Sequence, residues 1–117
     1  MKKLVEVGIL FDYYGSLLSE RQRSMVDKYY NEDLSLNEIG DLYDVSKQAV
    51  SENIKRAERR LYSFENKLHL KKRSERTTEF LKFIKEELNN SKTFETSERE
   101  ALLKKIDDFI KEDMGEL

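Results

Sequence analysis

The stretch SLNEIGDLYDVSKQAVSENIKRAERRL, residues 35–61, decides the fold of this 117-residue chain. It begins with Ser35-Leu36-Asn37-Glu38, a capping box in which the serine hydroxyl and the glutamate carboxylate satisfy free backbone amides at a helix start. The sequence therefore predicts a short helix over residues 35–43, a turn at Asp44-Val45 and a second helix capped by Ser46. A short helix that braces a second one, with polar residues at the start of the second, is the pattern of a helix-turn-helix.

Apolar residues recur along the second helix at steps of four and three, which places them on one helical face. They predict a single continuous helix to residue 69, and they are Val50, Ile54, Ala57, Leu61, Phe64 and Leu68. We interpret this seam as a packing surface and not as a ligand site. In the preceding short helix, we expect Leu36, Ile39 and either Leu42 or Tyr43 to point inward, with Gly40 allowing another helix to approach closely.

Polar and basic side chains occupy the face opposite the seam. Gln48 suits the edge of adenine, Lys47 suits guanine or phosphate, and Ser51 suits either. The arginines further along suit backbone phosphates, which fix register without reading sequence. The predicted nucleic-acid-binding residues are Lys47, Gln48, Ser51, Lys55, Arg56, Arg59 and Arg60.

Two helices are expected before this unit. Residues 4–14 are apolar on nearly every side, so a helix there must be covered from several directions or by a partner chain. Ser19 is a good N-cap for a helix over about residues 19–31. We interpret the paired tyrosines at the ends of these helices as packing residues, because tyrosine commonly buries its ring and exposes its hydroxyl.

Two amphipathic helices are expected after it. The polar tract KKRSERTT, residues 71–78, loosens the apolar pattern, and a fifth helix resumes it at Phe80, Leu81, Ile84 and Leu88. Ser97-Glu98-Arg99-Glu100 is a second capping box, which predicts a sixth helix. The residues of that helix expected to point inward are Leu102, Leu103, Ile106, Phe109 and Ile110.

Composition excludes several classes of protein. The chain has no proline, four glycines and 39% charged residues, which favours helices over sheets. It has no cysteine and one histidine, His69, so a thiolate or histidine metal site and a Cys/His nucleophile are excluded. We expect no cofactor, no metal, no catalytic residue and no enzymatic activity. Glu6 and Asp12 interrupt the N-terminal apolar run, so we expect no signal peptide, no membrane span and a cytoplasmic protein.

Charge is unevenly distributed along the chain. Residues 45–76 carry ten basic and four acidic side chains, a net charge of +6, whereas residues 1–44 and 77–117 each carry −4. A basic centre attracts phosphate, while acidic flanks limit indiscriminate adsorption to nucleic acid. The alternative interpretation of the basic centre is an ordinary solvated helix face.

These motifs carry a family resemblance. Residues 17–61 resemble the fourth region of bacterial sigma factors, and LFDYYGSLLSERQR, YYNEDLSLNEIG and VSKQAVSENIKRAERRLYSFENKLHL are similar to the YlxM family of small helix-turn-helix proteins. The resemblance covers residues 4–70 and implies a role, by gene association, in the signal recognition particle pathway. Two departures from the sigma pattern occur: Asp44 replaces the usual turn glycine, and Glu52-Asn53 replaces basic or small polar residues. Aspartate can adopt the left-handed conformation, so the turn is expected to survive.

The sequence thus predicts an all-α protein of about six helices. Residues 1–70 form a sigma-like helix-turn-helix domain with an apolar N-terminal helix. Residues 71–117 form a C-terminal helical pair that packs on the core or on a second subunit, and we expect a homodimer. The expected function is a regulator that binds DNA or signal recognition particle RNA. The alternative is a protein-interaction module that modulates proteins of that particle without binding DNA.

Overall fold

The computed structural model describes residues 2–90 and 95–115, and it confirms the all-α class with six α-helices. No strand occurs within those ranges. The elements are α1 (Lys2–Tyr14), the 3-10 turn η1 (Gly15–Leu17), α2 (Glu20–Tyr30), α3 (Leu36–Tyr43), α4 (Lys47–Leu68), α5 (Leu70–Asn90) and α6 (Thr96–Gly115).

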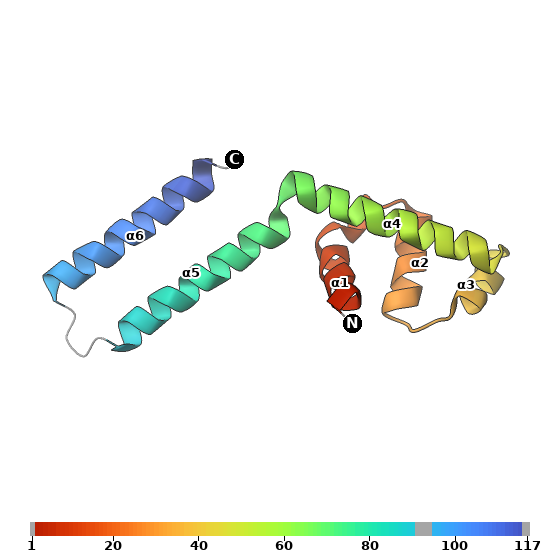
Figure 1. Cartoon of the computed structure of the whole chain (residues 1–117), viewed down its shortest axis with the longest axis horizontal. Coiled ribbons are helices and arrows are strands. Elements are labelled where there is room, and N and C mark those ends of the chain that lie inside the picture. Colours follow the sequence, from red (N-terminus) through yellow and green to blue (C-terminus); the bar gives the residue numbers. More distant parts are fainter. Residues whose placement is uncertain (1, 91–94, 116–117) are drawn as a thin grey trace. The chain divides into compact units, whose positions relative to one another are not determined.

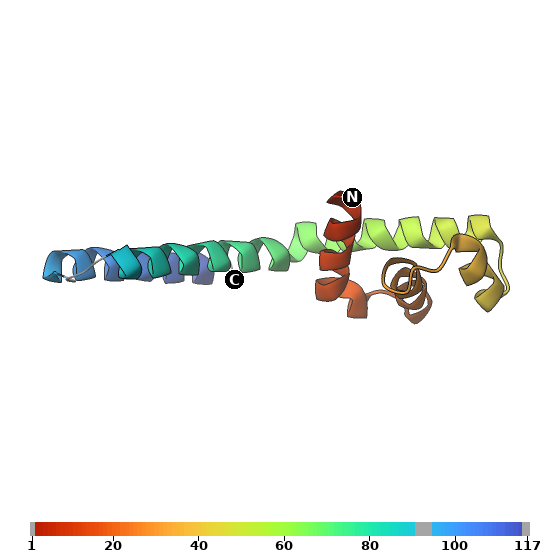
Figure 2. The ribbon, with the colours of Figure 1, turned by 90° about the horizontal axis from the view of Figure 1, so that it is seen from below.

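The chain forms two compact units, residues 1–71 and residues 72–117, and each is described by itself. In the first unit α4 is the longest helix, and α1, α2 and α3 all pack against it (Figure 1). Figure 2 shows the same unit turned, with α1 crossing α4. The long helix is therefore the common support of the first unit.

Two apolar clusters fill this unit, and α4 contributes to both. One joins α1 and α2 to Ala57 and Leu61, and the other joins α2 and α3 to Val50 and Ile54. Burial of such aliphatic side chains stabilises a fold by about 1.5–3 kcal/mol each. The predicted seam is confirmed from Val50 to Leu61, but Leu68 at the helix end is 47% exposed.

The predicted helix-turn-helix geometry is present. Ser35 Oγ accepts a hydrogen bond from the Glu38 amide at 3.1 Å, and Glu38 Oε1 accepts one from the Ser35 amide at 3.0 Å, which completes the capping box. Asp44 ends α3 in the left-handed conformation, with φ 56° and ψ 47°. Ser46 Oγ caps α4 by accepting from the Ala49 amide at 3.1 Å. Local capping chemistry thus produces the turn as expected.

The structure bears out the expectation for Gly40 of α3 and decides between Leu42 and Tyr43. A Cβ on Gly40 would lie 2.6 Å from the Val45 carbonyl oxygen and 3.7 Å from the Lys47 amide nitrogen, so Gly40 makes room for the backbone of the turn and for the first residue of α4. Leu42 is 62% exposed, whereas Tyr43 is half-buried and its hydroxyl donates to Ser24 Oγ on α2. Tyrosine takes the inward position because α2 offers its hydroxyl a partner.

The N-terminal helix is less covered in this unit than its composition predicts. Val7, Leu10 and Tyr14 are buried against the core, but Leu4 is 49% and Val5 65% exposed. A single packing surface covers one stripe of a helix, so a helix that is apolar on nearly every side leaves its other sides open.

The junction after α4 corrects the predicted start of the fifth helix. His69 takes the left-handed conformation with φ 55°, and α5 begins at once at Leu70, so the polar tract 71–78 is helical. Tyr14 explains this position: its hydroxyl accepts from the Leu70 amide at 3.0 Å and donates to Glu65 Oε1 at 2.5 Å. Glu65 also accepts from the Lys71 amide at 3.1 Å. These long-range caps satisfy the first amides of α5, which no local motif does.

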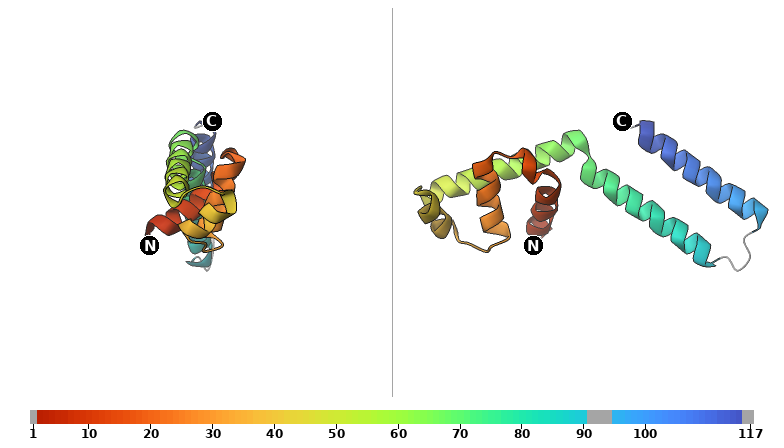
Figure 3. Two further views of the ribbon diagram at one scale, coloured as in Figure 1. Left: turned by 90° about the vertical axis from the view of Figure 1, so that its right-hand side faces the viewer. Right: turned by 180° about the vertical axis from the view of Figure 1, so that it is seen from behind.

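In the second unit α5 and α6 form an antiparallel hairpin, in which they run side by side (Figure 3). The rings of Phe80 and Phe109 stack with centroids 4.2 Å apart, and Arg73 Nη2 lies 3.4 Å from Asp113 Oδ2. No residue of α5 is fully buried. A pair of helices is too small to enclose a side chain from every direction.

Two expectations for α6 are wrong. The Arg99 amide bonds to the Glu95 carbonyl and α6 begins at Thr96, so Ser97 lies inside the first turn and does not cap it. Of the residues expected to point inward, Leu103 and Ile110 are 53% and 48% exposed. Those half-buried in the hairpin are Leu102, Ile106 and Phe109.

Candidate nucleic-acid interface

The exposed face of α4 brings most of the predicted binding residues together. Position along the helix explains this, because residues three and four apart lie above one another on a helix surface. Lys47 and Gln48 stand exposed at the start of α4, where a recognition helix meets base edges. Six of the seven predicted residues border this exposed face: Lys47, Gln48, Ser51, Lys55, Arg56 and Arg59.

Glu52 lies in the middle of this face and partly neutralises it. Its Oε1 is 3.7 Å from Arg56 Nη2 and 3.5 Å from Arg59 Nη2. All three side chains are more than half exposed, and exposed ion pairs of this kind contribute only about 0–1 kcal/mol. A phosphate can therefore displace the carboxylate from the arginines, although the carboxylate still repels a phosphate-lined groove.

Arg60 lies apart from the other six residues. Its Nη1 donates to Gln22 Oε1 at 2.8 Å and its Nη2 to the Leu17 carbonyl at 3.3 Å. The guanidinium also lies over the Phe64 ring, 5.4 Å from its centroid. These contacts tie α4 to α2 and η1, so the structure places Arg60 in the packing of the unit.

Asn53 also turns away from the exposed face. Its side-chain amide donates to the Ala49 carbonyl of the same helix at 3.1 Å, and the residue is half-buried. Of the two residues at the second departure from the sigma pattern, only Glu52 thus presents a charge to a ligand. The Asn53 side chain makes its hydrogen bond within α4 and does not contribute to the exposed face.

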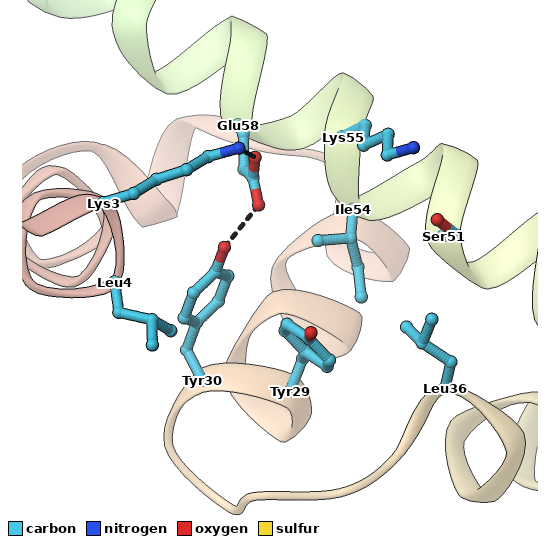
Figure 4. Close-up of a pocket in the computed structure, with 9 residues that line it drawn as sticks. All are labelled: Lys3, Leu4, Tyr29, Tyr30, Leu36, Ser51, Ile54, Lys55 and Glu58. Carbon is cyan, nitrogen blue, oxygen red and sulfur yellow. Dashed lines mark hydrogen bonds and ion pairs between the residues drawn. The ribbon is translucent and has the colours of Figure 1, made fainter. Parts of the chain in front are cut away.

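A pocket of about 380 Å³ opens beside Ser51 and Lys55, between α4 and the other helices of the first unit (Figure 4). Apolar side chains and tyrosine rings form its walls, with lysines at opposite sides. The lining residues are Lys3, Leu4, Tyr29, Tyr30, Leu36, Ser51, Ile54, Lys55 and Glu58.

Glu58 organises one wall of this pocket. It accepts a hydrogen bond from the Tyr30 hydroxyl, and its Oε2 lies 3.3 Å from Lys3 Nζ. Burial of the ring, followed by the hydrogen bond to Glu58, raises the pKa of Tyr30 above its ordinary value. The sequence analysis missed Lys3 and Glu58 because their side chains meet only after α1 folds against α4, and no local motif marks that contact.

The described part of the chain shows no cluster of three or more His, Asp or Glu side chains that would hold a metal ion. Within the same ranges, no helix combines the length and the apolar character that crossing a membrane requires.

Comparison with known proteins relates these features to a family. Residues 1–111 match the family described as "Putative helix-turn-helix protein, YlxM / p13 like". The chain is 43% identical over 107 residues to a UPF0122 protein of Halalkalibacterium halodurans, covering 92% of this chain and 96% of the relative. A UPF0122 protein of Clostridium perfringens is 34% identical over 110 residues, covering 94% and 98%. Both relatives extend across the two units.

Proposed function

The chain belongs to the YlxM-like helix-turn-helix family, and from that premise we propose that it is a regulator that binds duplex nucleic acid through the exposed face of α4. The observation that carries the proposal is the grouping of Lys47, Lys55, Arg56 and Arg59 on a helix that α3 braces. Cations on a projecting helix are the usual means of contact with phosphates.

The proposed mode is recognition of the sugar-phosphate backbone. Glu52 lies where base edges would be contacted, and a carboxylate there can accept only from the amino groups of cytosine or adenine. Lys55 and Arg59 lie further along the helix, where phosphate contacts fix position without reading sequence. Binding by shape and phosphates suits the structured RNA of the signal recognition particle as well as it suits DNA.

The alternative function is a protein-interaction module of the signal recognition particle pathway. The pocket beside Lys55 supports it, because apolar walls from Tyr29, Leu36 and Ile54 suit the side chains of a protein partner. The Glu52 ion pairs also support it, since they reduce the affinity of α4 for phosphate.

Binding measured across a salt series separates the two functions. Fluorescence anisotropy is recorded with labelled duplex DNA, signal recognition particle RNA and the protein of that particle. We expect affinity for a nucleic acid that falls with salt, and a salt slope smaller by about one unit for each phosphate contact removed by Lys55→Glu/Arg56→Glu. Lys104→Glu/Lys111→Glu, which makes the same change in net charge on α6, is the matched control and is expected to bind nearly as the natural chain. No binding to either nucleic acid at low salt would contradict the proposal, and binding to the protein alone would favour the alternative.

Glu52→Gln tests the role of the central carboxylate. Because the amide carries no charge, Arg56 and Arg59 lose their acidic competitor and nucleic-acid affinity is expected to rise several-fold, by about 1 kcal/mol. Asp41→Asn on α3 removes an exposed carboxylate outside the exposed face of α4 and outside the capping box, and is the control. Unchanged affinity in Glu52→Gln would indicate that this face of α4 does not contact the nucleic acid.

A further inference from the structure

The hairpin of α5 and α6 carries an apolar face that the hairpin itself does not cover. Leu81 and Leu88 on α5 are 59% and 53% exposed, and Leu103 and Ile110 on α6 are 53% and 48% exposed. Ile84 and Ile106 lie between them and are half-buried. These six residues, here called the hairpin face, leave much of their apolar surface in water.

The residues from the two helices lie on the same side of the hairpin. Phe80 and Phe109 mark where the helices touch, because their rings stack on one another. Leu81 and Ile110 each follow that contact residue by one position, a rotation of about 100° around the helix. Antiparallel helices rotate in opposite senses when viewed from one end, so the two displacements bring Leu81 and Ile110 to one common side. The hairpin face is therefore continuous across both helices.

A two-helix unit with such a face is half of a four-helix bundle. No residue of α5 is fully buried, and the ring contacts between Phe80, Phe83 and Phe109 cover only the line between the helices. In a four-helix bundle, a second layer of two helices covers this kind of face and completes the core.

Charges beside the face indicate what covers it. On α5 the exposed charged residue that directly flanks the face is Lys85, and on α6 these residues are Glu100 and Asp107; Lys82, Lys104 and Lys111 lie further round their helices. Lys85, Glu100 and Asp107 form no ion pair with any other residue that the structure describes. If a second hairpin lies face to face with the first about a twofold axis parallel to the helices, α5 of each copy lies beside α6 of the other. Lys85 of one copy then lies beside Glu100 and Asp107 of its partner, twice.

We propose that the hairpin face is a dimer interface, in which a second copy of this chain packs its own hairpin face to complete an antiparallel four-helix bundle. The apolar residues form the centre of the interface, and the lysines and carboxylates form its rim and set which helices are neighbours. The proposal concerns α5 and α6 alone and does not depend on what α4 binds.

The first experiment measures the molar mass of the full chain by sedimentation equilibrium at about 1–100 µM. We expect a dimer, and we expect Leu103→Glu to raise its dissociation constant at least tenfold, as at the centre of other interfaces. Val5→Glu is the matched control, because Val5 is the most exposed apolar residue of α1, at 65%, and lies outside the hairpin face. Circular dichroism verifies that both variants keep their helices.

A monomer at the highest concentration would overturn the proposal. A dimer that Val5→Glu weakens and Leu103→Glu does not would also overturn it, because the interface would then lie on α1. If Leu103→Glu loses helical content, Leu103→Ser replaces it, and an unchanged dissociation constant in that variant counts against the proposal.

The second experiment tests the pairing of the rims. Lys85→Glu and Glu100→Lys/Asp107→Lys chains each place like charges against like in a homodimer, so each is expected to dimerise more weakly than the natural chain. An equimolar mixture restores opposite charges at both contacts, and we expect it to regain dimers. In a control mixture, Glu79→Lys/Glu86→Lys, which reverses two carboxylates elsewhere on α5, replaces Glu100→Lys/Asp107→Lys and tests attraction by net charge alone. If the first mixture forms no more dimer than the control mixture, the arrangement of α5 beside the partner's α6 is overturned.

Discussion

The unit of residues 1–71 and the hairpin of residues 72–117 have similar sequence patterns but very different burial. In α4 the amphipathic seam meets three other helices, and Val50, Ala57 and Leu61 are completely buried. In α5 a comparable apolar stripe meets one helix, and none of its residues is fully buried. Periodicity determines which face of a helix is apolar, whereas the number of neighbouring helices determines how much of that face leaves water.

The largest expected effect comes from shortening a buried side chain in one unit and an exposed one in the other. Leu61→Ala removes a fully buried side chain and leaves a cavity, so it is expected to lower the free energy of unfolding by about 2–5 kcal/mol. Leu81→Ala is expected to cost less than about 1 kcal/mol in the monomer, since the side chain is already 59% exposed. Urea unfolding followed by circular dichroism, at a protein concentration where sedimentation shows a monomer, measures both losses of stability. Equal losses would contradict the difference in burial between the two units.

Two glycines sharpen the comparison within the first unit. Gly40→Ala places a Cβ against the Val45 carbonyl oxygen, where the backbone of the turn must shift, and is expected to cost about 1–3 kcal/mol. Gly8→Ala on α1 meets nothing within 4 Å and is expected to stabilise the helix by about 0.5–1 kcal/mol. Thermal unfolding measures the pair. If Gly40→Ala does not lower stability, the turn can move the Val45 carbonyl away from position 40 at no cost.

Alkaline pH is expected to affect the two units differently. Burial raises the pKa of Tyr14, Tyr30 and Tyr62, and interactions with neighbouring carboxylates add to the shift for each of them. A raised folded-state pKa means that this stabilisation is complete below the unfolded value of about 10 and is lost as pH rises above it. The hairpin contains no tyrosine.

Amide hydrogen exchange tests this difference for each helix. The protection of each amide is compared between pH values after the exchange rate is corrected for its intrinsic dependence on pH. Tyr30→Phe is expected to weaken the alkaline response of α2 and α4, while it also lowers stability at neutral pH because Glu58 loses a donor. Loss of protection in α5 and α6 at the same pH as in α4 would contradict the prediction.

The smallest effect is expected at two serines that look alike in the sequence. Ser46→Ala removes the cap of α4 and is expected to cost about 1 kcal/mol, because the Ala49 amide loses its acceptor. Ser97→Ala is expected to change stability by less than about 0.5 kcal/mol, since Ser97 lies inside α6. Thermal unfolding of both variants is the measurement. A larger loss of stability in Ser97→Ala would indicate that Ser97 caps α6, as the capping box in the sequence predicts.

How much the sequence could predict differs from feature to feature. The capping box at Ser35, the left-handed Asp44 and the seam of α4 were predictable because each depends on residues within a few positions of one another. The candidate face of α4 follows from the same local rules, and six of its seven predicted residues gather there. Arg60 was not predictable, because whether it points to solvent or to Gln22 depends on where α2 lies.

By itself, therefore, the sequence determined the all-α class, the helix-turn-helix and the polar face of its second helix, since capping and periodicity act over short distances. Tertiary structure alone decided that α5 begins at Leu70, because Tyr14 supplies its cap from 56 residues away. It also decided that Glu58 joins Lys3 and Tyr30 at the pocket wall, and that Leu103 stays exposed. Each of these outcomes depends on which helices become neighbours, and that is a property of the packed chain.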